Sequence, residues 1–183
     1  MACLANTTYD GITVGEVPIE FKRVEIPRDH EQLVEFLGND EWPFHEQRHL
    51  TPADIHAVDF SSADVASFWI VDNKQTVGLI RLLDLGDIGR GAPLFDLRIT
   101  SRHRGCGFGT RATRWIVDHL FTSYPELHRI EANTRADNAA MQRALTAAGF
   151  AHEGTLRLAW RGEEGHWFDT LVYGMLRTDW TSA

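Results

Sequence analysis

A glycine-rich stretch carries the residues whose types and spacing are most capable of chemistry. It consists of Arg104, Gly105, Cys106, Gly107, Phe108, Gly109 and Thr110. Residues 93–99 before it have the composition of a strand, and residues 111–121 after it carry apolar side chains at helical spacing. Glycines between a strand and a helix let the backbone turn tightly with its N–H groups directed outward, and the helix start adds unpaired donors and a partial positive charge. The stretch therefore predicts an anion site, with phosphate as the usual ligand.

Two common phosphate-binding signatures match this stretch poorly. A kinase-type phosphate loop ends in Gly-Lys followed by Ser or Thr, and the stretch contains no lysine. A dinucleotide fingerprint, G-x-G-x-x-G, is matched by Gly105 and Gly107 but has Thr110 in its third glycine position. Because Glu131 lies near the expected place of the ribose-binding acid, the dinucleotide interpretation is weakened but stays open.

The elements that must position this stretch follow from periodicity, caps and breakers. Helices are expected after Asp29, after Thr51-Pro52, over 111–121, and after Asp137 or Asn138, the last closed by Gly149. Besides the strand at 93–99, we expect strands at residues 12–14, 21–26, 67–71, 76–85, 127–133, 154–160 and 166–176. The last two form a long hairpin.

Length and composition bound the class of protein. At 183 residues a single domain is the natural expectation, with a loosely held lead-in at 1–19 and one domain at 20–183. The net charge of −8 argues against non-specific nucleic-acid binding and suits a cationic partner such as an amine, although it equally serves solubility alone. No signal peptide and no membrane span are visible, so a cytoplasmic protein is expected.

Two separated motifs resemble a known superfamily. Arg104-x-x-Gly107-x-Gly109 resembles the pyrophosphate-binding signature of the GNAT superfamily, the acetyl-CoA-dependent N-acetyltransferases. Asn138, followed by Gly149-Phe150, Glu153-Gly154 and Arg157, is similar to the branch that contains ribosomal-protein-alanine and diamine N-acetyltransferases. The resemblance covers about residues 20–180. It implies an α/β (α+β) fold with a mixed, mostly antiparallel sheet of about seven strands, about four helices, and a splay between the fourth and fifth strands.

The resemblance also implies how the cofactor acetyl-CoA binds. Backbone groups of Leu97, Arg98 and Ile99 would pair with the pantetheine arm, and residues 105–110 would hold the pyrophosphate. Asn138 would contact the cofactor near its sulfur, or it would serve only as a helix cap.

Direct transfer to an amine needs a group that removes a proton. Glu131 and Asn133 lie two apart on an expected strand and face the same side. In relatives that modify protein amino termini, the catalytic glutamate often falls at the position of Asn133, but an amide cannot accept a proton. Glu131 acting through a water is therefore the first candidate, and Asp96 or Asp169 is the next. Many relatives place a tyrosine at the position of Leu145 as the general acid, and others place a serine at the position of Met141. Both positions are apolar in this sequence, so Tyr173 is a substitute candidate for the acid.

Aromatic side chains are expected to form the acceptor site. The resemblance places it against Trp42, Phe44 and His45 and against a hairpin that carries Trp160 and Asp169. Nearby carboxylates would suit a cationic amine, although the aromatic residues could simply pack under the loops; these carboxylates are Glu41, Glu46, Glu163 and Glu164. The spacing of His45, His49 and His56 matches no compact ligand set, so no metal is expected.

The sequence thus predicts an N-acetyltransferase that moves the acetyl group of acetyl-CoA directly to a primary amine. The acceptor is expected to be a protein N-terminus or a small amine such as a polyamine, an amino sugar or an amine-bearing antibiotic. The expected partners include neither nucleic acid nor membrane, and the protein is expected to be a monomer or a homodimer. Two alternatives stay open: an acyl-CoA-binding sensor that has lost transfer, and a dinucleotide-dependent oxidoreductase.

Overall fold

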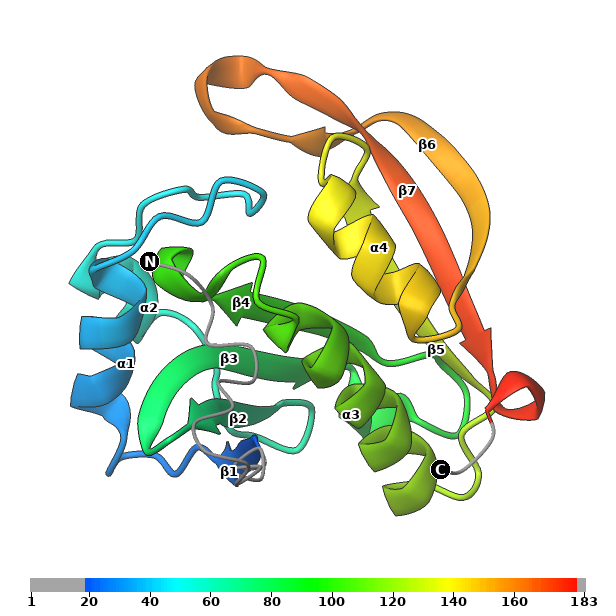
Figure 1. Cartoon of the computed structure of the whole chain (residues 1–183), viewed down its shortest axis with the longest axis horizontal. Helices are drawn as coiled ribbons and strands as arrows, with labels where there is room; N and C mark the ends of the chain where they lie inside the picture. Colours follow the sequence, from blue (N-terminus) through cyan, green and yellow to red (C-terminus); the bar gives the residue numbers. More distant parts are fainter. Residues whose placement is uncertain (1–18, 181–183) are drawn as a thin grey trace, which may run out of the picture.

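The chain forms two antiparallel sheets that lean away from each other (Figure 1). The computed structural model describes residues 19–180, so the expected lead-in up to residue 18, with its strand at 12–14, lies outside the described residues. The first sheet has the order β1-β2-β3-β4, and the second has the order β5-β7-β6. The strands are β1 (Glu20–Arg23), β2 (Ala66–Asp72), β3 (Gln75–Leu83), β4 (Leu94–Ile99), β5 (Arg129–Arg135), β6 (Ala151–Arg161) and β7 (Trp167–Leu176).

Four α-helices accompany the two sheets in the described part of the chain. They are α1 (His30–Gly38), α2 (Pro52–His56), α3 (Phe108–Ser123) and α4 (Ala139–Ala147). Short 3-10 turns occur at Leu85–Asp87, Ser101–His103, Glu163–Gly165 and Arg177–Asp179. Figure 1 shows α1 and α2 beside the first sheet, α3 across that sheet, and α4 beside the second sheet.

The two sheets separate between β4 and β5. Among the described residues no ladder joins these strands, and a single backbone hydrogen bond, from Glu131 N to Pro93 O at 3.1 Å, connects them near their beginnings. One edge of β4 is therefore paired with β3 while the other is open. The expected seven strands, four helices and splay are confirmed.

Local sequence signals explain several boundaries. Thr51 and Asp54 form a reciprocal capping box at the start of α2, and the side chain of Asn138 caps α4 by accepting from Met141 N at 3.1 Å. The expected side-chain cap from Asp29 to α1 is absent. Its carboxylate instead accepts hydrogen bonds from Glu25 N at 2.9 Å and from the buried Trp69 indole at 3.4 Å, because it lies under the turn that precedes the helix.

Two groups of buried side chains hold these elements together. The larger lies between the first sheet, α3 and the second sheet, and includes Ile80, Ile116 and Ile130, each 0% exposed. The smaller packs α1 and α2 on the opposite face of the first sheet, around Leu33, Trp42 and Leu79. β2 is buried along almost its whole length because both of its faces are covered.

Arg177 fixes the second sheet to the end of α3. It follows β7, and its guanidinium donates to Leu127 O at 2.7 Å, Phe121 O at 3.0 Å and Tyr124 O at 2.6 Å. These carbonyls lie at the C-terminal end of α3 and just beyond it, where backbone acceptors lack helical partners. The contact therefore sets where the second sheet stands relative to the first.

Replacing Arg177 by Met should destabilise the protein by about 2–4 kcal/mol, because three carbonyls lose charged donors. The free energy of unfolding from urea titration measures this loss. The exposed Arg90 is the matched control, and Arg90→Met should change stability by less than about 0.5 kcal/mol. Equal stability of the two variants would contradict an anchoring role for Arg177.

Candidate active site

The glycine-rich stretch forms an open backbone turn at the start of α3. Gly105 and Gly107 have φ values of +76° and +82°, in the left-handed region that glycine tolerates. Gly107 is also the N-cap residue of α3, so the first amide groups of the helix follow it directly. A Cβ atom added at Gly105, Gly107 or Gly109 would meet no atom within 4 Å. Among the described residues, this surface thus has room for a phosphate beside the first amide groups of the helix.

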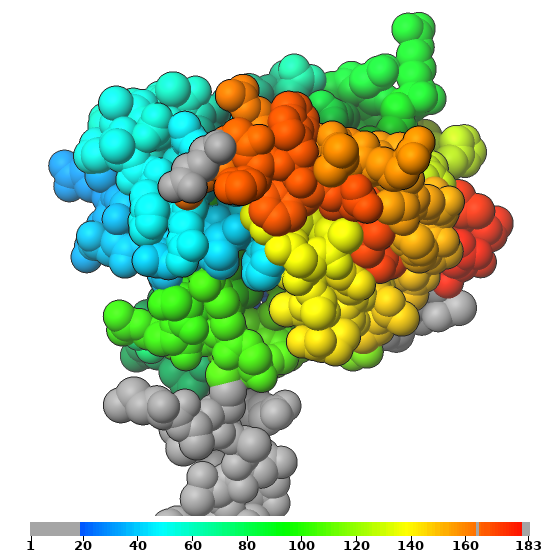
Figure 2. All heavy atoms as spheres, turned by 90° about the horizontal axis from the view of Figure 1, so that it is seen from above, coloured from blue at the N-terminus to red at the C-terminus, as the bar shows by residue number. Residues whose placement is uncertain are grey.

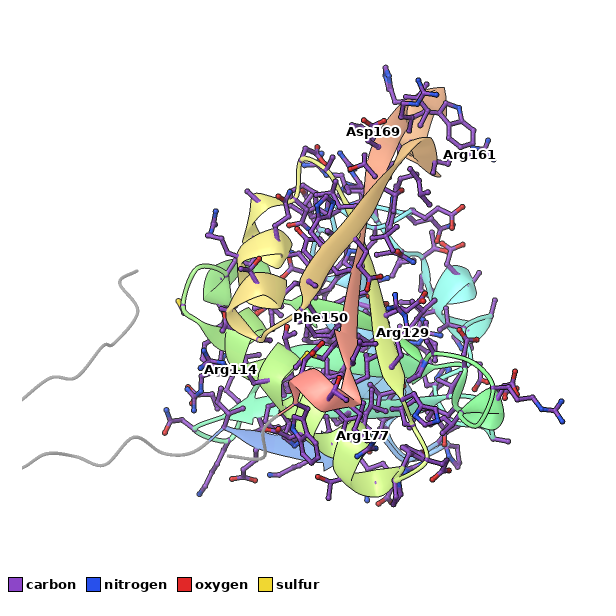
Figure 3. All side chains as sticks on the ribbon, turned by 90° about the vertical axis from the view of Figure 1, so that its right-hand side faces the viewer. Arg114, Arg129, Phe150, Arg161, Asp169 and Arg177 are labelled. Carbon is purple, nitrogen blue, oxygen red and sulfur yellow. The ribbon has the colours of Figure 1, made fainter. Side chains whose placement is uncertain are left out.

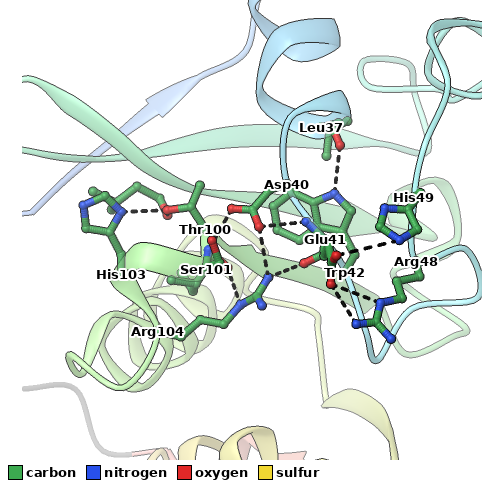
Figure 4. Close-up of polar contacts among 12 residues, drawn as sticks. Leu37, Asp40, Glu41, Trp42, Arg48, His49, Thr100, Ser101, His103 and Arg104 are labelled. Carbon is green, nitrogen blue, oxygen red and sulfur yellow. Dashed lines mark hydrogen bonds and ion pairs between the residues drawn. The ribbon is translucent and has the colours of Figure 1, made fainter. Parts of the chain in front are cut away.

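Arg104 ties this turn to the segment after α1 (Figure 4). Its guanidinium donates to Ile99 O at 2.9 Å and to Glu41 O, and it lies 3.8 Å from Asp40 Oδ1. The same Asp40 accepts a hydrogen bond from Ser101 N at 2.7 Å. Arg104 therefore positions the glycine turn through backbone contacts.

A cavity of about 460 Å³ runs from the glycine turn along β4 and α4. At one end it is lined by Arg104, Gly105, Gly107, Gly109 and Thr110. Further along it is lined by Leu97, Arg98, Ile99 and residues of α4. The residues predicted to bind the cofactor are thus brought together, apart from Cys106 and Phe108, which do not line it. Phe108 instead packs against the larger core.

A second cavity of about 600 Å³ opens beyond the first, between β3, β4, β5 and the segment joining α1 to α2. The residues that line both cavities are Phe44, His45, Leu97, Arg98, Asn138 and Met141. They define a junction at the open edge of β4, from which one cavity leads to the glycine turn and the other away from it.

Contacts of Arg135 and Glu163 join the second sheet and its hairpin to the segment after α1. Arg135 of β5 donates to Pro43 O at 2.9 Å and stacks 3.6 Å from the centre of the Phe168 ring. The tip of the β6–β7 hairpin supplies Glu163, which accepts a hydrogen bond from Arg48 N at 2.9 Å. Figure 2 shows the hairpin tip, the segment after α1 and α4 meeting on this face.

Asp96 is the centre of the polar contacts at the junction. Its Oδ1 lies 2.8 Å from His45 Nε2, and its Oδ2 lies 3.1 Å from Arg98 Nε and 3.8 Å from Arg81 Nη1. Burial alone would raise the pKa of Asp96, but the Arg98 guanidinium and the hydrogen bond from His45 lower it to well below the ordinary carboxyl range. Asp96 is therefore an ionised anchor and a poor proton acceptor.

The residues predicted as acid or base are not gathered at one place. The Glu131 carboxylate lies 2.9 Å from Arg129 Nε and lines neither cavity, because Arg129 joins it to Glu153 on β6. Figure 3 shows Arg129 well away from Asp169 at the hairpin end. Asp169 accepts from Leu158 N at 2.8 Å, and Tyr173 is 5% exposed within the core, so both serve the hairpin. Asn133 does line the larger cavity.

The predicted acceptor residues divide between the two cavities. Trp42 is 1% exposed, donates to Leu37 O at 2.9 Å, and borders only the smaller cavity (Figure 4). Phe44 and His45 lie at the junction, and Trp160 lines the larger cavity. Asp169 borders neither. Trp42 thus packs under the groove that begins at the glycine turn.

The three histidines weighed as metal ligands point to different partners. His45 contacts Asp96, His49 lies 3.9 Å from Glu41, and His56 contacts Pro52 O. Within residues 19–180 no group of three or more His, Cys, Asp or Glu side chains is arranged to hold a metal ion. No helix in the same range is long and apolar enough to cross a membrane.

Comparison with known proteins identifies the family. Residues 21–151 match the family model described as the acetyltransferase (GNAT) domain. This is more than half of the chain, so the chain belongs to the GNAT acetyltransferase family. As a member, it is an acyltransferase that uses acetyl-CoA, and the glycine turn with its open groove fits that cofactor. The search of curated proteins returned no match.

Solved structures share the fold at low sequence identity. Mycobacterium smegmatis RimJ in complex with CoA-disulfide is 20% identical with a TM-score of 0.72, over 90% of this chain and 85% of that one. Vibrio cholerae spermidine N-acetyltransferase in complex with CoA and spermine is 21% identical with a TM-score of 0.71, over 88% and 96%. A GNAT-family acetyltransferase from Bacillus anthracis is 16% identical with a TM-score of 0.70, over 88% and 96%.

Sequence reasoning missed the polar set around Asp96. The sequence does not predict that the side chains of Arg81 and Arg98 contact Asp96, and it predicts His45 only as a residue that contacts the acceptor amine. One signal was available: Asp96 and Arg98 share a face of the strand because they are two residues apart. The contacts from His45 and Arg81 join distant segments and have no local signature.

Blocking the groove at Gly109 should abolish CoA binding. Gly109 lines the smaller cavity, lies in α3 without a left-handed φ, and has no neighbour within 4 Å of an added Cβ. Gly109→Leu should therefore fold and raise the Kd for CoA at least about tenfold by calorimetry, since a side chain would occupy the phosphate position. Gly89, exposed and equally uncrowded, supplies the control Gly89→Leu. Unchanged CoA affinity in Gly109→Leu would place the phosphate elsewhere.

Asp96→Asn should lower stability by about 3 kcal/mol at neutral pH, because two guanidinium groups lose their carboxylate. The folded state lowers the pKa of Asp96, so its contribution is complete above the unfolded value of about 4 and declines as the pH falls below it. Urea titrations between pH 3 and 7 (roughly spanning that value) should show the difference from wild type shrinking in acid. The control Glu126→Gln, at an exposed position, should show no such trend. A loss of stability in Asp96→Asn that does not depend on pH would contradict the assignment of Asp96 as an ionised anchor.

Proposed function

We propose that the protein transfers the acetyl group of acetyl-CoA directly to a primary amine bound in the larger cavity, with His45 as the general base. One observation carries this proposal. His45 lines both cavities, its Nε2 lies 2.8 Å from Asp96 Oδ1, and its buried Nδ1 has no hydrogen-bond partner among the described residues. A ring nitrogen available for a proton thus stands where the two cavities join.

The cofactor would occupy the smaller cavity. Bound acetyl-CoA supplies an acetyl thioester that is open to attack by an amine. Amide groups of residues 105–110 would bind its diphosphate, and the open edge of β4 at Leu97, Arg98 and Ile99 would pair with its pantetheine arm. Asn138 uses its Oδ1 to cap α4, which leaves its amide N–H₂ as a donor at the junction.

The tautomer of a neutral His45 ring follows from its partner. A carboxylate only accepts hydrogen bonds, so in the neutral ring Nε2 carries the proton and Nδ1 presents a lone pair. Primary amines are mostly ammonium ions at neutral pH, and Nδ1 would accept the proton that has to leave. Asp96 stays ionised and holds the ring in this orientation, the role that a buried carboxylate plays toward histidine in acyl-transfer enzymes.

The bond changes then balance without a covalent enzyme intermediate. The ammonium form of the amine would first lose one proton to His45 Nδ1. The N–C bond would then form as the C–S bond breaks, the nitrogen would release its second proton to solvent, and the departing thiolate would take a proton from solvent. Backbone N–H groups on the open edge of β4 would stabilise the developing oxyanion. Tyr173 has no part in this scheme because it is buried in the core.

Two of the structural neighbours support an amine as the acceptor. One is a RimJ protein, and the other is a spermidine N-acetyltransferase in complex with CoA and spermine. On this basis a protein N-terminus and a small amine are both candidate classes. A sensor that binds CoA without transfer is the competing function, and a thiol-release assay with an amine library separates the two.

His45→Gln should lower kcat by roughly a hundredfold to ten-thousandfold while leaving the Kd for CoA unchanged. The loss should be greatest at low pH, where free amine is scarce, so the acidic limb of the pH–rate profile should change shape. Steady-state thiol release between pH 6 and 9 (about the range in which histidine and amines change charge) measures both effects.

His49→Gln is the matched control, since His49 lies on the same segment but lines neither cavity. It should leave the rates within about twofold. Wild-type turnover in His45→Gln would assign the base elsewhere. CoA binding without thiol release from any amine in the wild type would instead favour the sensor.

A further inference from the structure

We infer that the acceptor is a compact amine that also carries a carboxylate, such as an apolar α-amino acid, and that Arg81 and Arg98 bind this carboxylate. The inference rests on the proposed function, because it assigns a substrate class to the larger cavity. It opposes the expectation of a purely cationic acceptor.

Buried side-chain atoms without a hydrogen-bond partner are concentrated in the residues that line this cavity. In the described part of the chain, six buried side-chain polar atoms lack a hydrogen-bond partner, and four of them belong to residues that line it: His45 Nδ1, Arg81 Nε, Arg98 Nη1 and Trp160 Nε1. Three of the four can only donate. Buried polar groups are normally paired, so a group of donors with a common cavity indicates a ligand rich in acceptor oxygens.

Strand register places the two guanidinium groups side by side. Arg81 on β3 is opposite Asp96 on β4, and Leu79 is opposite Arg98, so all four side chains face the same way. The Arg81 and Arg98 side chains are only 19% and 13% exposed. Burial lowers the pKa of Arg81, and the attraction of Asp96 only partly offsets it. Both guanidinium groups share the one carboxylate of Asp96 as their ion-pair partner among the described residues.

The carboxylates near the cavity do not supply the missing partner. Asp96 is shared by both arginines and by His45. Glu46 also lines the cavity but is exposed. Glu41 pairs with Arg48 at 2.7 Å, and Glu163 accepts a hydrogen bond from Arg48 N, so these two of the acids expected to attract a cation are engaged elsewhere. A ligand carboxylate matches the remaining geometry, because guanidinium groups bind it through paired N–H donors.

The distance between the two ends of the ligand is short. His45 contacts one oxygen of Asp96 and Arg81 approaches the other, so the base and the carboxylate site flank a single side chain. An amine that reaches His45 and a carboxylate that reaches Arg81 must therefore be separated by few atoms. Apolar residues line the rest of the cavity and would contact an aliphatic or aromatic side chain; they include Leu50, Val58, Phe60, Leu83 and Leu94.

The test compares matched acceptors with the wild-type protein. Leucine, methionine and phenylalanine are each assayed against the corresponding amide and the corresponding amine without a carboxylate, with spermidine as a cationic reference. Thiol release gives kcat/KM for each. At least one amino acid should exceed its amide and its decarboxylated amine at least tenfold, and should exceed spermidine. Equal or better rates for the amides, the simple amines or spermidine would overturn the inference.

Variants then test which side chains produce the preference. Arg81→Gln should lower the ratio of kcat/KM for the preferred amino acid to kcat/KM for its amide at least tenfold, while the Kd for CoA changes less than twofold. Trp160→Phe keeps an aromatic ring while it removes the Nε1 donor and part of the indole, so it keeps the test valid if Arg81→Gln does not fold. It should lower the preference for the amino acid over its amide at least threefold. The exposed Arg90 supplies the control Arg90→Gln, which should change nothing.

Failure of this inference and failure of the proposed function look different. A protein that binds CoA and acetylates amines, with neither a carboxylate preference nor an effect of Trp160→Phe, overturns the acceptor class alone. A protein that fails to bind CoA overturns the proposed function and the inference with it.

Discussion

The buried carboxylate of Asp96 is the interaction on which the candidate active site depends. It joins the segment after α1, through His45, to the face of β3 and β4 that carries Arg81 and Arg98. Two guanidinium groups in a largely buried position are costly without an anion, and Arg98 together with His45 in turn lowers the pKa of Asp96 and keeps it ionised. The contacts of Asp96 with His45, Arg81 and Arg98 therefore account for the orientation of His45 and for the two guanidinium groups at the cavity.

The splay between β4 and β5 makes this arrangement accessible. Strands that paired along their length would bury the edge of β4 and fill the junction, whereas here a single backbone hydrogen bond joins the two sheets near their beginnings. Contacts elsewhere hold the two sheets in place: Arg177 fixes the second sheet to α3, and Arg135 connects β5 to Pro43. The junction of the two cavities thus lies where the edges of the two sheets stay apart.

Much of the fold, and the gathering of the glycine turn and the end of β4 around one cavity, is predictable from sequence because the signals are local. Glycines at 105 and 107, Thr51 with Asp54, and Asn138 each act on backbone within a few residues. The acid–base residues were less predictable. Glu131 is drawn to Arg129 and Glu153, Tyr173 packs in the core, and His45 meets Asp96 across 51 positions of sequence. Such partners depend on how distant elements pack, which strand periodicity does not encode.

A crystal structure of the ternary complex with CoA and a preferred acceptor tests the central claim most directly. We predict the diphosphate against the amides of residues 105–110, the acceptor nitrogen within hydrogen-bonding distance of His45 Nδ1, and His45 Nε2 still bound to Asp96. Density that places CoA away from the glycine turn, or the acceptor nitrogen beside a different base with His45 rotated away from Asp96, would contradict the account.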